Sequence, residues 1–377
     1  MDRRRFLHTA GPGLAALSLG LGGCNDPEPD EAAQLGTPAD PFPALNFITR
    51  DPAHTDYRPA VDATGTQVVF ERQTHPHPAN QPPLLVLVQG IDQPAPSPGL
   101  LIPPTAMVTV PFPDSQTRPD WNWATGKIAF TGEVTGTKGT EVYILSADRS
   151  QLSVLPNSRW HIYPMWSSDG DFLVLDNSDG VPAPVRPVSA LFTSGGAVQE
   201  HNLNGTDFSS PAVSMFGGFA APKPGMPRTI AYAGQPALAS WGVLPGQPMP
   251  LEPVYNQDNN YIFLNTLVGG AYRSSPMEPG ASVQTYDPAY QGRAPYWSPN
   301  GRYIVFESSR AGGYALFLAD LSTGAPPVQL TNGLYWAQHA KFFPDGQRLV
   351  CTALQQPNAQ GSGPRGIAVI DISAYVT

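Results

Sequence analysis

The chain has 377 residues, a formal net charge of −9, 41% hydrophobic residues and only 14% charged residues. This length is ample for one large core, and the acidic balance without a basic stripe excludes nucleic acid as a partner. The 44 prolines and 37 glycines indicate many turns, which suits an all-β protein.

Residues 1–23 are predicted to be an export signal. The opening "MDRRRFLHTA" resembles the twin-arginine motif R-R-x-F-L-K, with His in the Lys place. The apolar stretch that follows is too short to span a bilayer comfortably. It ends in "LGGC", which resembles a bacterial lipobox, so Cys24 is the predicted site of lipidation. The alternative is an ordinary secretory signal with a chance cysteine.

Residues 24–41 are acidic, rich in proline and without apolar periodicity, so we expect a flexible tether. Asn25 follows Cys24, whereas enteric lipoproteins of the inner membrane tend to carry Asp there. The absence of Asp favours the outer membrane but does not decide between the two membranes. The second cysteine, Cys351, lies in a predicted strand. With Cys24 lipidated no disulfide is available, and we expect Cys351 to be a small buried hydrophobe.

From about Phe42 to the end, the chain repeats one frame. A bulky residue is followed four positions later by Gly and then by an apolar run of strand length. The Asx-Gly dipeptides in three copies suit a tight hairpin turn. The copies are Val61 to Gly65, Trp166 to Gly170, Trp297 to Gly301 and Phe342 to Gly346, with a version from Trp121 to Gly126 that is one residue longer.

Each unit also offers a third strand, such as "GYALFLADLSTG" at 313–324, and a short fourth strand, such as "PPVQLTNG" at 326–333. A unit of four antiparallel strands that repeats every roughly 40–50 residues predicts a β-propeller. Residues 328–346 align without a gap on 283–301. Val283–Tyr286 is therefore the predicted last strand of the unit before Trp297.

The count of units predicts six blades, with seven as the alternative. The unit after Pro211 is long, with 228–234 as its second strand and either 239–244 or 261–267 as its third; if these two belong to separate blades, the count is seven. The last unit ends after its third strand, so we expect residues 45–51 to add the missing strand and close the ring, because an open edge invites pairing. The predicted units start near Pro59, Pro119, Pro164, Pro211, Pro295 and Ala340.

The motif W-S-x-[DN]-G-x-x-[IL]-x-[FL] at 297–306, followed by "ALFLADLSTG" and "VQLTNG", resembles the repeat of the TolB-type β-propeller, a WD40-like repeat. The resemblance covers the predicted propeller domain, residues 42–377, and implies its fold; propellers host many unrelated functions. TolB carries an α/β domain before its propeller, and we expect none in this chain, since the first repeat begins near Tyr57. Related propellers belong to prolyl-oligopeptidase-type enzymes, but the sequence has no G-x-S-x-G elbow, which argues against a peptidase.

His161 and His339 are candidate metal ligands. Each starts a predicted innermost strand, which lines the channel of a propeller, and His54 could join them there. Lyase-like relatives of the family place metal-binding histidines around such a channel; the alternative is that these residues are simply hydrated. His75 and His77 form a pair in a Pro-rich loop, and two ligands fall short of the three or four that a metal site needs.

Aromatic residues fall into two sets. Trp166 and Trp297 occupy the fixed position of the repeat and are predicted to pack between blades. Four others lie in loops that lead into blades, where an aromatic rim would suit a peptide or carbohydrate ligand. These candidates are Trp160, Tyr290, Tyr335 and Trp336.

No phosphate loop, CxxC pair or ordered Ser-His-Asp set is present, and Asp169 and Asp345 are explained by their turns. The sequence therefore predicts a monomeric, lipid-anchored protein of the bacterial cell envelope, on the periplasmic or cell-surface side. Its propeller would bind an envelope protein, a peptide or a carbohydrate, with no catalytic residue and no cofactor. The alternative is a polysaccharide lyase or hydrolase with a His-bound metal in the channel. The partner and the propeller face that binds it stay open.

Overall fold

The computed structural model describes one compact unit, which runs from Phe42 to Thr377. The predicted export signal, Cys24 and the tether up to residue 40 lie outside the described residues. The residues that the structure describes are 41–78, 81–93, 97–103, 106–108, 110–136, 139–177, 189–193, 197–201, 213–236, 260–268, 271–282 and 286–377.

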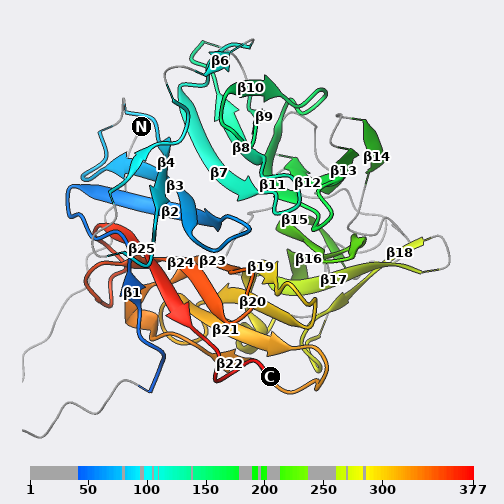
Figure 1. Ribbon diagram of the computed structural model, residues 1–377. Coiled ribbons are helices and arrows are strands. Elements are labelled where there is room, and N and C mark those ends of the chain that lie inside the picture. Colours follow the sequence, from blue (N-terminus) through cyan, green and yellow to red (C-terminus); the bar gives the residue numbers. More distant parts are fainter. Residues whose placement is uncertain are drawn as a thin grey trace, which may run out of the picture. The chain divides into compact units, whose positions relative to one another are not determined.

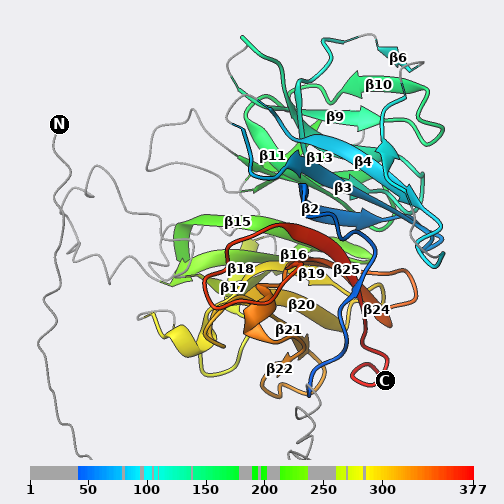
Figure 2. The ribbon, with the colours of Figure 1, turned by 90° about the vertical axis from the view of Figure 1, so that its left-hand side faces the viewer.

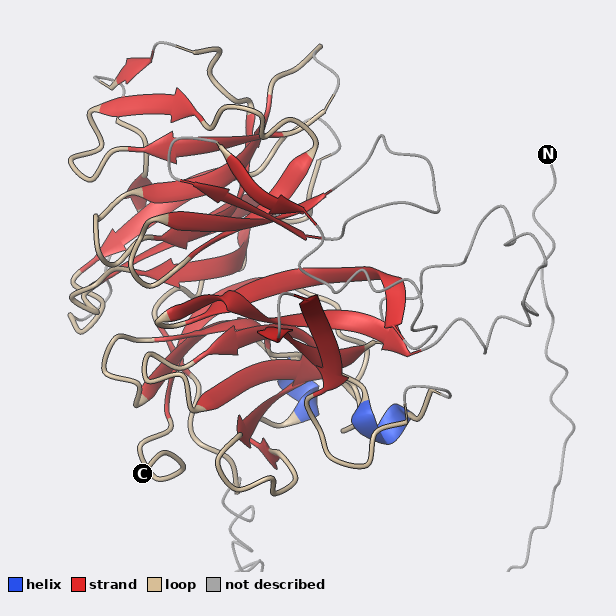
Figure 3. Cartoon of the chain, turned by 90° about the vertical axis from the view of Figure 1, so that its right-hand side faces the viewer, coloured by secondary structure: helices blue, strands red, loops and turns tan. Residues whose placement is uncertain are grey.

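Within these ranges nearly all regular structure is β, with two one-turn 3-10 helices, η2 (Pro288–Tyr290) and η3 (Gly333–Tyr335) (Figure 3). None of the helices described is long and apolar enough to cross a membrane. The strands pair into six sheets, each of which is ordered from its first strand outwards. Three of them are β2 (His54–Val61), β3 (Gln67–Thr74), β4 (Leu84–Gln89), β5 (Gly99–Leu100); β7 (Ser115–Trp121), β8 (Ile128–Glu133), β9 (Glu141–Leu145), β10 (Gln151–Val154), β6 (Met107–Val108); and β11 (His161–Trp166), β12 (Phe172–Asn177), β13 (Ser189–Thr193), β14 (Val198–His201). The others are β15 (Val213–Lys223), β16 (Met226–Pro236), β17 (Tyr261–Val268), β18 (Ala271–Pro276); β19 (Arg293–Trp297), β20 (Tyr303–Ser308), β21 (Ala315–Asp320), β22 (Val328–Gln329); and β23 (Gln338–Phe342), β24 (Arg348–Leu354), β25 (Arg365–Asp371), β1 (Asn46–Phe47).

The sheets are arranged as in a β-propeller. Each first strand contacts the first strand of the next sheet, in the order β2, β7, β11, β15, β19 and β23, and β23 contacts β2 again. In Figure 1 these six strands surround the centre of the molecule. The first strands therefore line a central channel, and the later strands of each sheet lie outside them.

The core lies between neighbouring sheets, because each strand alternates its side chains between two covered faces. Trp297, which is 4% exposed, packs against Ala221 and Ala231 of the preceding sheet and donates from Nε1 to the Ala221 carbonyl oxygen at 3.1 Å. Trp166 is buried in the same way against Ala129. The fixed tryptophan of the repeat thus packs between sheets, as predicted.

The repeat frame located the strands well, with one alternative resolved and two corrections. Residues 261–267 form the third strand of their sheet, β17, whereas 239–244 lie outside the described residues. The expectation of four strands in every sheet is wrong for the sheet of β7, because β6 pairs parallel to β10 as a fifth strand. The predicted last strand at 283–286 is also wrong: β18 holds that place, Tyr286 is in no strand, and 283–285 are not described. The described residues contain no seventh sheet.

The ring is closed by β1, which pairs antiparallel with β25 through Asn46↔Val369 and Phe47↔Ala368. Figure 2 shows this blue segment beside the red β25. The Thr49 hydroxyl adds to the junction by accepting from the Ile367 backbone N–H at 2.8 Å. Residues 45–51 therefore supply the missing strand, as predicted.

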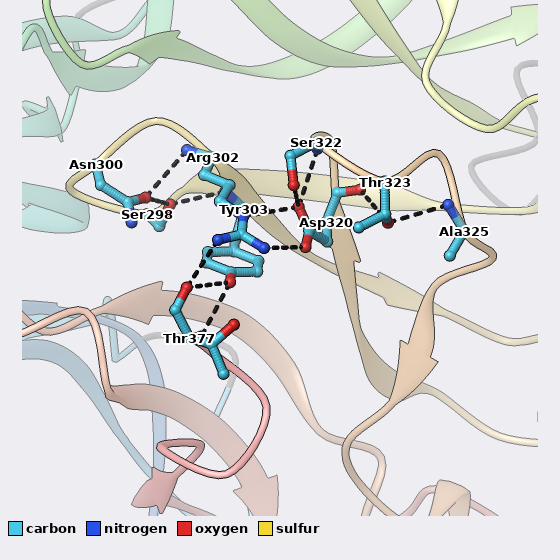
Figure 4. A network of polar contacts seen from close by, with 9 residues as sticks. All are labelled: Ser298, Asn300, Arg302, Tyr303, Asp320, Ser322, Thr323, Ala325 and Thr377. Carbon is cyan, nitrogen blue, oxygen red and sulfur yellow. Dashed lines mark hydrogen bonds and ion pairs between the residues drawn. The ribbon is translucent and has the colours of Figure 1, made fainter.

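The C-terminus makes a second link between sheets (Figure 4). The Thr377 carbonyl oxygen accepts from Arg302 Nη1 at 2.7 Å and from the Tyr303 hydroxyl at 3.2 Å. Arg302 is itself held by Asp320 through two hydrogen bonds of 3.0 and 2.6 Å. The last residue of the chain is thus fixed to the sheet that begins with β19.

Candidate functional site

Every first strand contains a β-bulge at the same place. The register shifts where two residues of the first strand face one residue of the second. The first residue of each bulge has a left-handed backbone that side chains other than glycine rarely adopt. These residues are Arg58 (φ 48°), Arg118 (φ 55°), Tyr163 (φ 53°), Phe219 (φ 57°), Ala294 (φ 48°) and His339 (φ 54°).

The local sequence explains the bulge. The second bulge residue is Pro in four strands and Ala in the other two, Ala220 and Ala340. Proline has no N–H to donate, so it suits a position where the ladder is interrupted. Backbone strain that recurs at one level of a fold points to a functional constraint there. We call the six left-handed residues the bulge ring, since all six line one cavity of about 60 Å³ in the channel.

Three neighbouring strands, β23, β2 and β7, place His339, Arg58 and Arg118 side by side in the ring. Arg58 Nη1 donates to Glu71 Oε2 at 2.8 Å, and Glu71 Oε1 accepts the backbone N–H of Arg118 at 2.5 Å. The side chain of Glu71 is only 1% exposed. Burial opposes the charge of Arg58, yet the Glu71 carboxylate and Tyr163 raise its pKa above the ordinary value. We call His339, Arg58 and Arg118 the cationic arc, after its two arginines.

Arg118 differs from Arg58 because no described carboxylate pairs with it. Its guanidinium lies 4.3 Å from the centroid of the Tyr163 ring, and Nη1 donates to the Thr117 hydroxyl at 3.3 Å. Its Nε is buried and has no hydrogen-bond partner among the residues that the structure describes. The cavity wall therefore carries a positive charge that no described acid balances.

The other half of the ring, from β11, β15 and β19, carries Tyr163, Phe219 and Ala294. We call it the neutral arc. The rings of Tyr163 and Phe219 are tilted by 59° with centroids 4.7 Å apart, a favourable aromatic geometry. Met165 and Tyr296 extend this wall along the channel.

Lys341 links β23 to β7. From β23 its Nζ reaches Asp120 Oδ1 at 2.7 Å and the Pro119 carbonyl oxygen at 3.0 Å, both on β7. The same Nζ lies 5.6 Å from the centroid of Tyr296. Burial, and then the Asp120 carboxylate, raise the pKa of Tyr296 well above its usual range. Lys341 is therefore matched by an acid, and Tyr296 is a neutral wall residue.

His339 is neutral at pH 7. Burial, followed by the positive charges of four nearby arginines, holds its pKa well below the usual range. Its Nδ1 is buried and has no hydrogen-bond partner in the described structure. The four arginines are Arg58, Arg293, Arg365 and Arg118.

Glu307 completes the polar groups around the channel. Its Oε1 accepts from Arg293 Nε at 3.1 Å, and its Oε2 is buried without a partner among the described residues. Burial raises the pKa of Glu307, and Arg293 opposes that rise. Arg293 is thus paired, and Arg365 is held by the carbonyl oxygens of Trp336 and Gly361.

The histidines do not assemble as the metal hypothesis requires. His54 Nδ1 lies 2.7 Å from Asp51, and His161 Nδ1 lies 3.1 Å from the Arg159 carbonyl oxygen. Of the three, only His339 lines the cavity. Among the residues described, no three His, Cys, Asp or Glu side chains are grouped so that they could hold a metal ion. The chain thus offers no described ligand set for a metal-dependent lyase.

The four predicted rim residues lie away from the cavity and are half-buried. Trp336 donates from Nε1 to the Asn358 carbonyl oxygen at 3.1 Å and packs beside Tyr314. The Tyr290 ring packs edge-on against the Tyr261 ring, with the two centroids 6.1 Å apart. Tyr335 packs against the core of the β23 sheet, and Trp160 covers Gly139. All four therefore have a packing role.

Analysis of the sequence missed the bulge ring, although a signal for it was present. Five of the six ring residues stand three positions before the bulky residue of the repeat, Phe219 being the exception, and in four units Pro follows the ring residue directly. Pro211 was a misplaced start and is not described; the equivalent bulge is at Phe219-Ala220. The turn and the strand repeat in composition, whereas the ring position varies in each unit.

Comparisons with known proteins agree on the fold. No protein-family model matches the sequence, and no curated protein matches it either. The similar solved structures include TolB from Acinetobacter baumannii, with 14% identity over 81% of this chain and a TM-score of 0.48. This chain spans 64% of the length of that TolB chain. The tricorn protease has 12% identity over 85% of this chain and 26% of its own, with a TM-score of 0.50. An oligogalacturonate lyase in complex with manganese has 11% identity over 87% of this chain and 93% of its own, with a TM-score of 0.47.

Proposed function

We propose that the chain is a lipoprotein of the bacterial cell envelope whose propeller binds a ligand or partner through its central channel and carries out no reaction. In this proposal residues 1–23 direct export, Cys24 carries the lipid, residues 24–41 form a tether and the propeller acts as a monomer. We also assign six blades, counting the five-stranded sheet as one blade.

One observation carries the proposal: a single backbone device is repeated around the channel with different side chains. Six bulges turn Arg, Arg, Tyr, Phe, Ala and His towards one cavity. Structural repetition alone would be served by six similar residues, whereas a binding site needs different ones. The aromatic residues of the loops, Trp160, Tyr290, Tyr335 and Trp336, would then contact a larger partner only at its margin.

A capture experiment tests the role of the channel. The full chain is purified in detergent and used to capture components from solubilised cell envelopes of the same cells. We expect a specific envelope component that is recovered by the wild type and by Arg348→Gln at the start of β24, outside the cavity lining, and lost with Phe219→Ala. Recovery that is unaffected by Phe219→Ala, or no specific recovery, would contradict the proposal.

A second experiment tests the anchor. The wild-type chain should sediment with membranes and incorporate labelled palmitate, whereas Cys24→Ser should do neither. Cys351→Ser is the matched control, since Cys351 is a buried thiol in β24 and should leave labelling unchanged. Labelling that survives Cys24→Ser would exclude lipidation at this cysteine.

A further inference from the structure

We propose that the bulge ring is a binding site for a small organic acid with a single carboxylate. The carboxylate lies against the cationic arc at Arg118, and the apolar body lies along Tyr163 and Phe219 of the neutral arc and along Met165. This inference rests on the proposed function, because it names the ligand class of the same channel.

The charge of the ligand follows from which cations are already paired. Arg58 Nη1 lies 2.8 Å from Glu71 Oε2, and Lys341 Nζ lies 2.7 Å from Asp120 Oδ1, so each of these cations has an acid partner. Arg118 is the cation of the cavity wall without a described acid partner. One unbalanced charge in a partly buried site favours a monoanion, since a second negative charge would be desolvated without compensation.

The geometry of the free groups favours a carboxylate. A guanidinium presents a planar fork that a carboxylate matches with two hydrogen bonds. The buried Nε of Arg118 and the buried Nε of Arg58 both lack partners in the described structure. His339 Nδ1 is a third such atom, buried and without a partner in the described part of the chain. An acid in the cavity would give these groups the hydrogen bonds that buried polar atoms require.

The size and lining of the cavity favour a short acid with an apolar chain. A volume of about 60 Å³ accommodates a carboxylate and a few carbon atoms, because a water-sized site needs roughly 10–15 Å³ on the same measure. Met165 and Tyr296 also line a second cavity of about 40 Å³, whose walls include Trp166 and Trp297. The two cavities thus share the side chains of Met165 and Tyr296, over which a chain of several carbons can leave the ring.

Calorimetric titration of the full chain with hexanoate and hexanamide tests the proposal. The two probes have the same chain length, and only the acid carries a charge at pH 7. We expect hexanoate to bind at least tenfold more tightly than hexanamide, and propionate to bind more weakly than hexanoate. Equal affinity of acid and amide would overturn the proposal, and so would the absence of acid binding.

The variant Arg118→Gln locates the site. Because Arg118 has no described carboxylate partner, its replacement leaves no described buried acid unpaired, and the circular dichroism spectrum should be unchanged. We expect at least a tenfold loss of hexanoate affinity, against less than twofold for Arg348→Gln, which removes an arginine that pairs with Asp345 in the turn between β23 and β24 and does not line the cavity. An unchanged affinity in Arg118→Gln, or equal displacement of hexanoate by sulfate, would contradict the assignment.

A further pair of probes separates the two sources of a carboxylate. A pentapeptide that ends in Leu with a free carboxylate is compared with the same peptide amidated. Binding of hexanoate without the free peptide identifies a free acid as the ligand, whereas binding of the free peptide without hexanoate overturns the small-acid proposal in favour of a chain terminus. If neither probe binds but the capture experiment recovers a channel-dependent partner, the carboxylate inference fails and the proposed binding function stands.

Discussion

The two arcs of the bulge ring share one backbone and differ in almost everything else. All six ring residues have φ between 48° and 57°. His339, Arg58 and Arg118 form the cationic side, and Tyr163, Phe219 and Ala294 form the neutral side. The repeat thus fixes where the side chain points, and the residue at that position determines, independently in each blade, whether that part of the cavity wall is charged, aromatic or small.

The two arcs are also held together by different forces. On the cationic side, Glu71 joins two neighbouring sheets by accepting from Arg58 and from the Arg118 backbone. On the neutral side, the tilted contact between the Tyr163 and Phe219 rings joins their sheets. Buried charges that lose a partner are far more costly than apolar contacts that loosen, so the arcs should respond differently to truncation.

The largest effect is expected for Glu71→Ala. The change leaves the Arg58 charge and the Arg118 N–H without their acceptor in a buried setting. We expect a loss of about 3–5 kcal/mol in the free energy of unfolding. Urea denaturation followed by circular dichroism, with an unchanged m-value, measures it.

The control for Glu71 is Asp320→Ala, which removes the partner of Arg302. That ion pair has side-chain exposures of 34% and 23%, so its loss should be worth below about 1 kcal/mol. Equal losses in the two variants would show that the cationic arc is not held by its buried carboxylate.

Phe219→Ala should weaken the neutral arc by a smaller amount. The side chain contacts the Tyr163 ring in a tilted geometry and lines the cavity, so we expect a loss of about 1–2 kcal/mol, below the roughly 3–5 kcal/mol of a fully buried phenylalanine. The same variant should lower the affinity for hexanoate more than that for propionate, because it shortens the apolar wall. Equal effects on both acids would argue that the body of the ligand does not lie on this arc.

His339→Asn should make the free energy of unfolding depend less on pH. In the wild type the pKa of His339 is held below its unfolded value of about 6.5 by burial and by the arginines, so below pH 6.5 the unfolded state takes up the proton first. Stability therefore falls on going from about pH 7 to 5.5, by at most about 1.4 kcal/mol per pH unit from this residue.

Urea midpoints at several pH values, taken as the difference between His339→Asn and the wild type, measure that slope. This difference removes the contribution of Glu307. Because the pKa of Glu307 is raised in the folded chain, that residue makes stability rise as the pH falls, opposite to the effect of His339. His77→Asn in an exposed loop is the matched control. A slope that is unchanged in His339→Asn would show that His339 stays accessible to protons in the folded chain.

The sequence predicted the fold to the level of single strands because the signals for the fold are local. The β-hairpins form where the repeat places an Asx-Gly turn, with a bulky residue four positions before its Gly and an apolar run after it. Residues 45–51 were expected to cover the free edge of the last sheet, and β1 lies there. The strand expected at 283–286 failed because a gapless alignment assumes equal spacing. The unit that contains β15 to β18 has a different length between its third strand and the next bulge.

The candidate site could not be predicted in the same way. His161 and His339 look equivalent at the start of two first strands, yet His339 occupies the bulge and His161 lies two residues before it. Which side chain reaches the channel depends on the bulge register, and a shift of one residue reverses the face. The pairing of Lys341 with Asp120 joins residues 221 positions apart, and no local pattern encodes it.

Ala294→Gly tests the backbone that the two arcs share, and its effect is the smallest. A left-handed conformation costs a residue other than glycine roughly 1–2 kcal/mol, whereas glycine adds roughly 0.5–1 kcal/mol of unfolded-state entropy. The variant should therefore be stabilised by up to about 1 kcal/mol, with hexanoate affinity changed less than twofold, since Ala294 gives the cavity only a methyl group. Ala60→Gly is the control, because Ala60 is buried on β2 without a positive φ and should be destabilised. If both variants lose stability alike, the bulge carries no strain, and the difference between the arcs would rest on side chains alone.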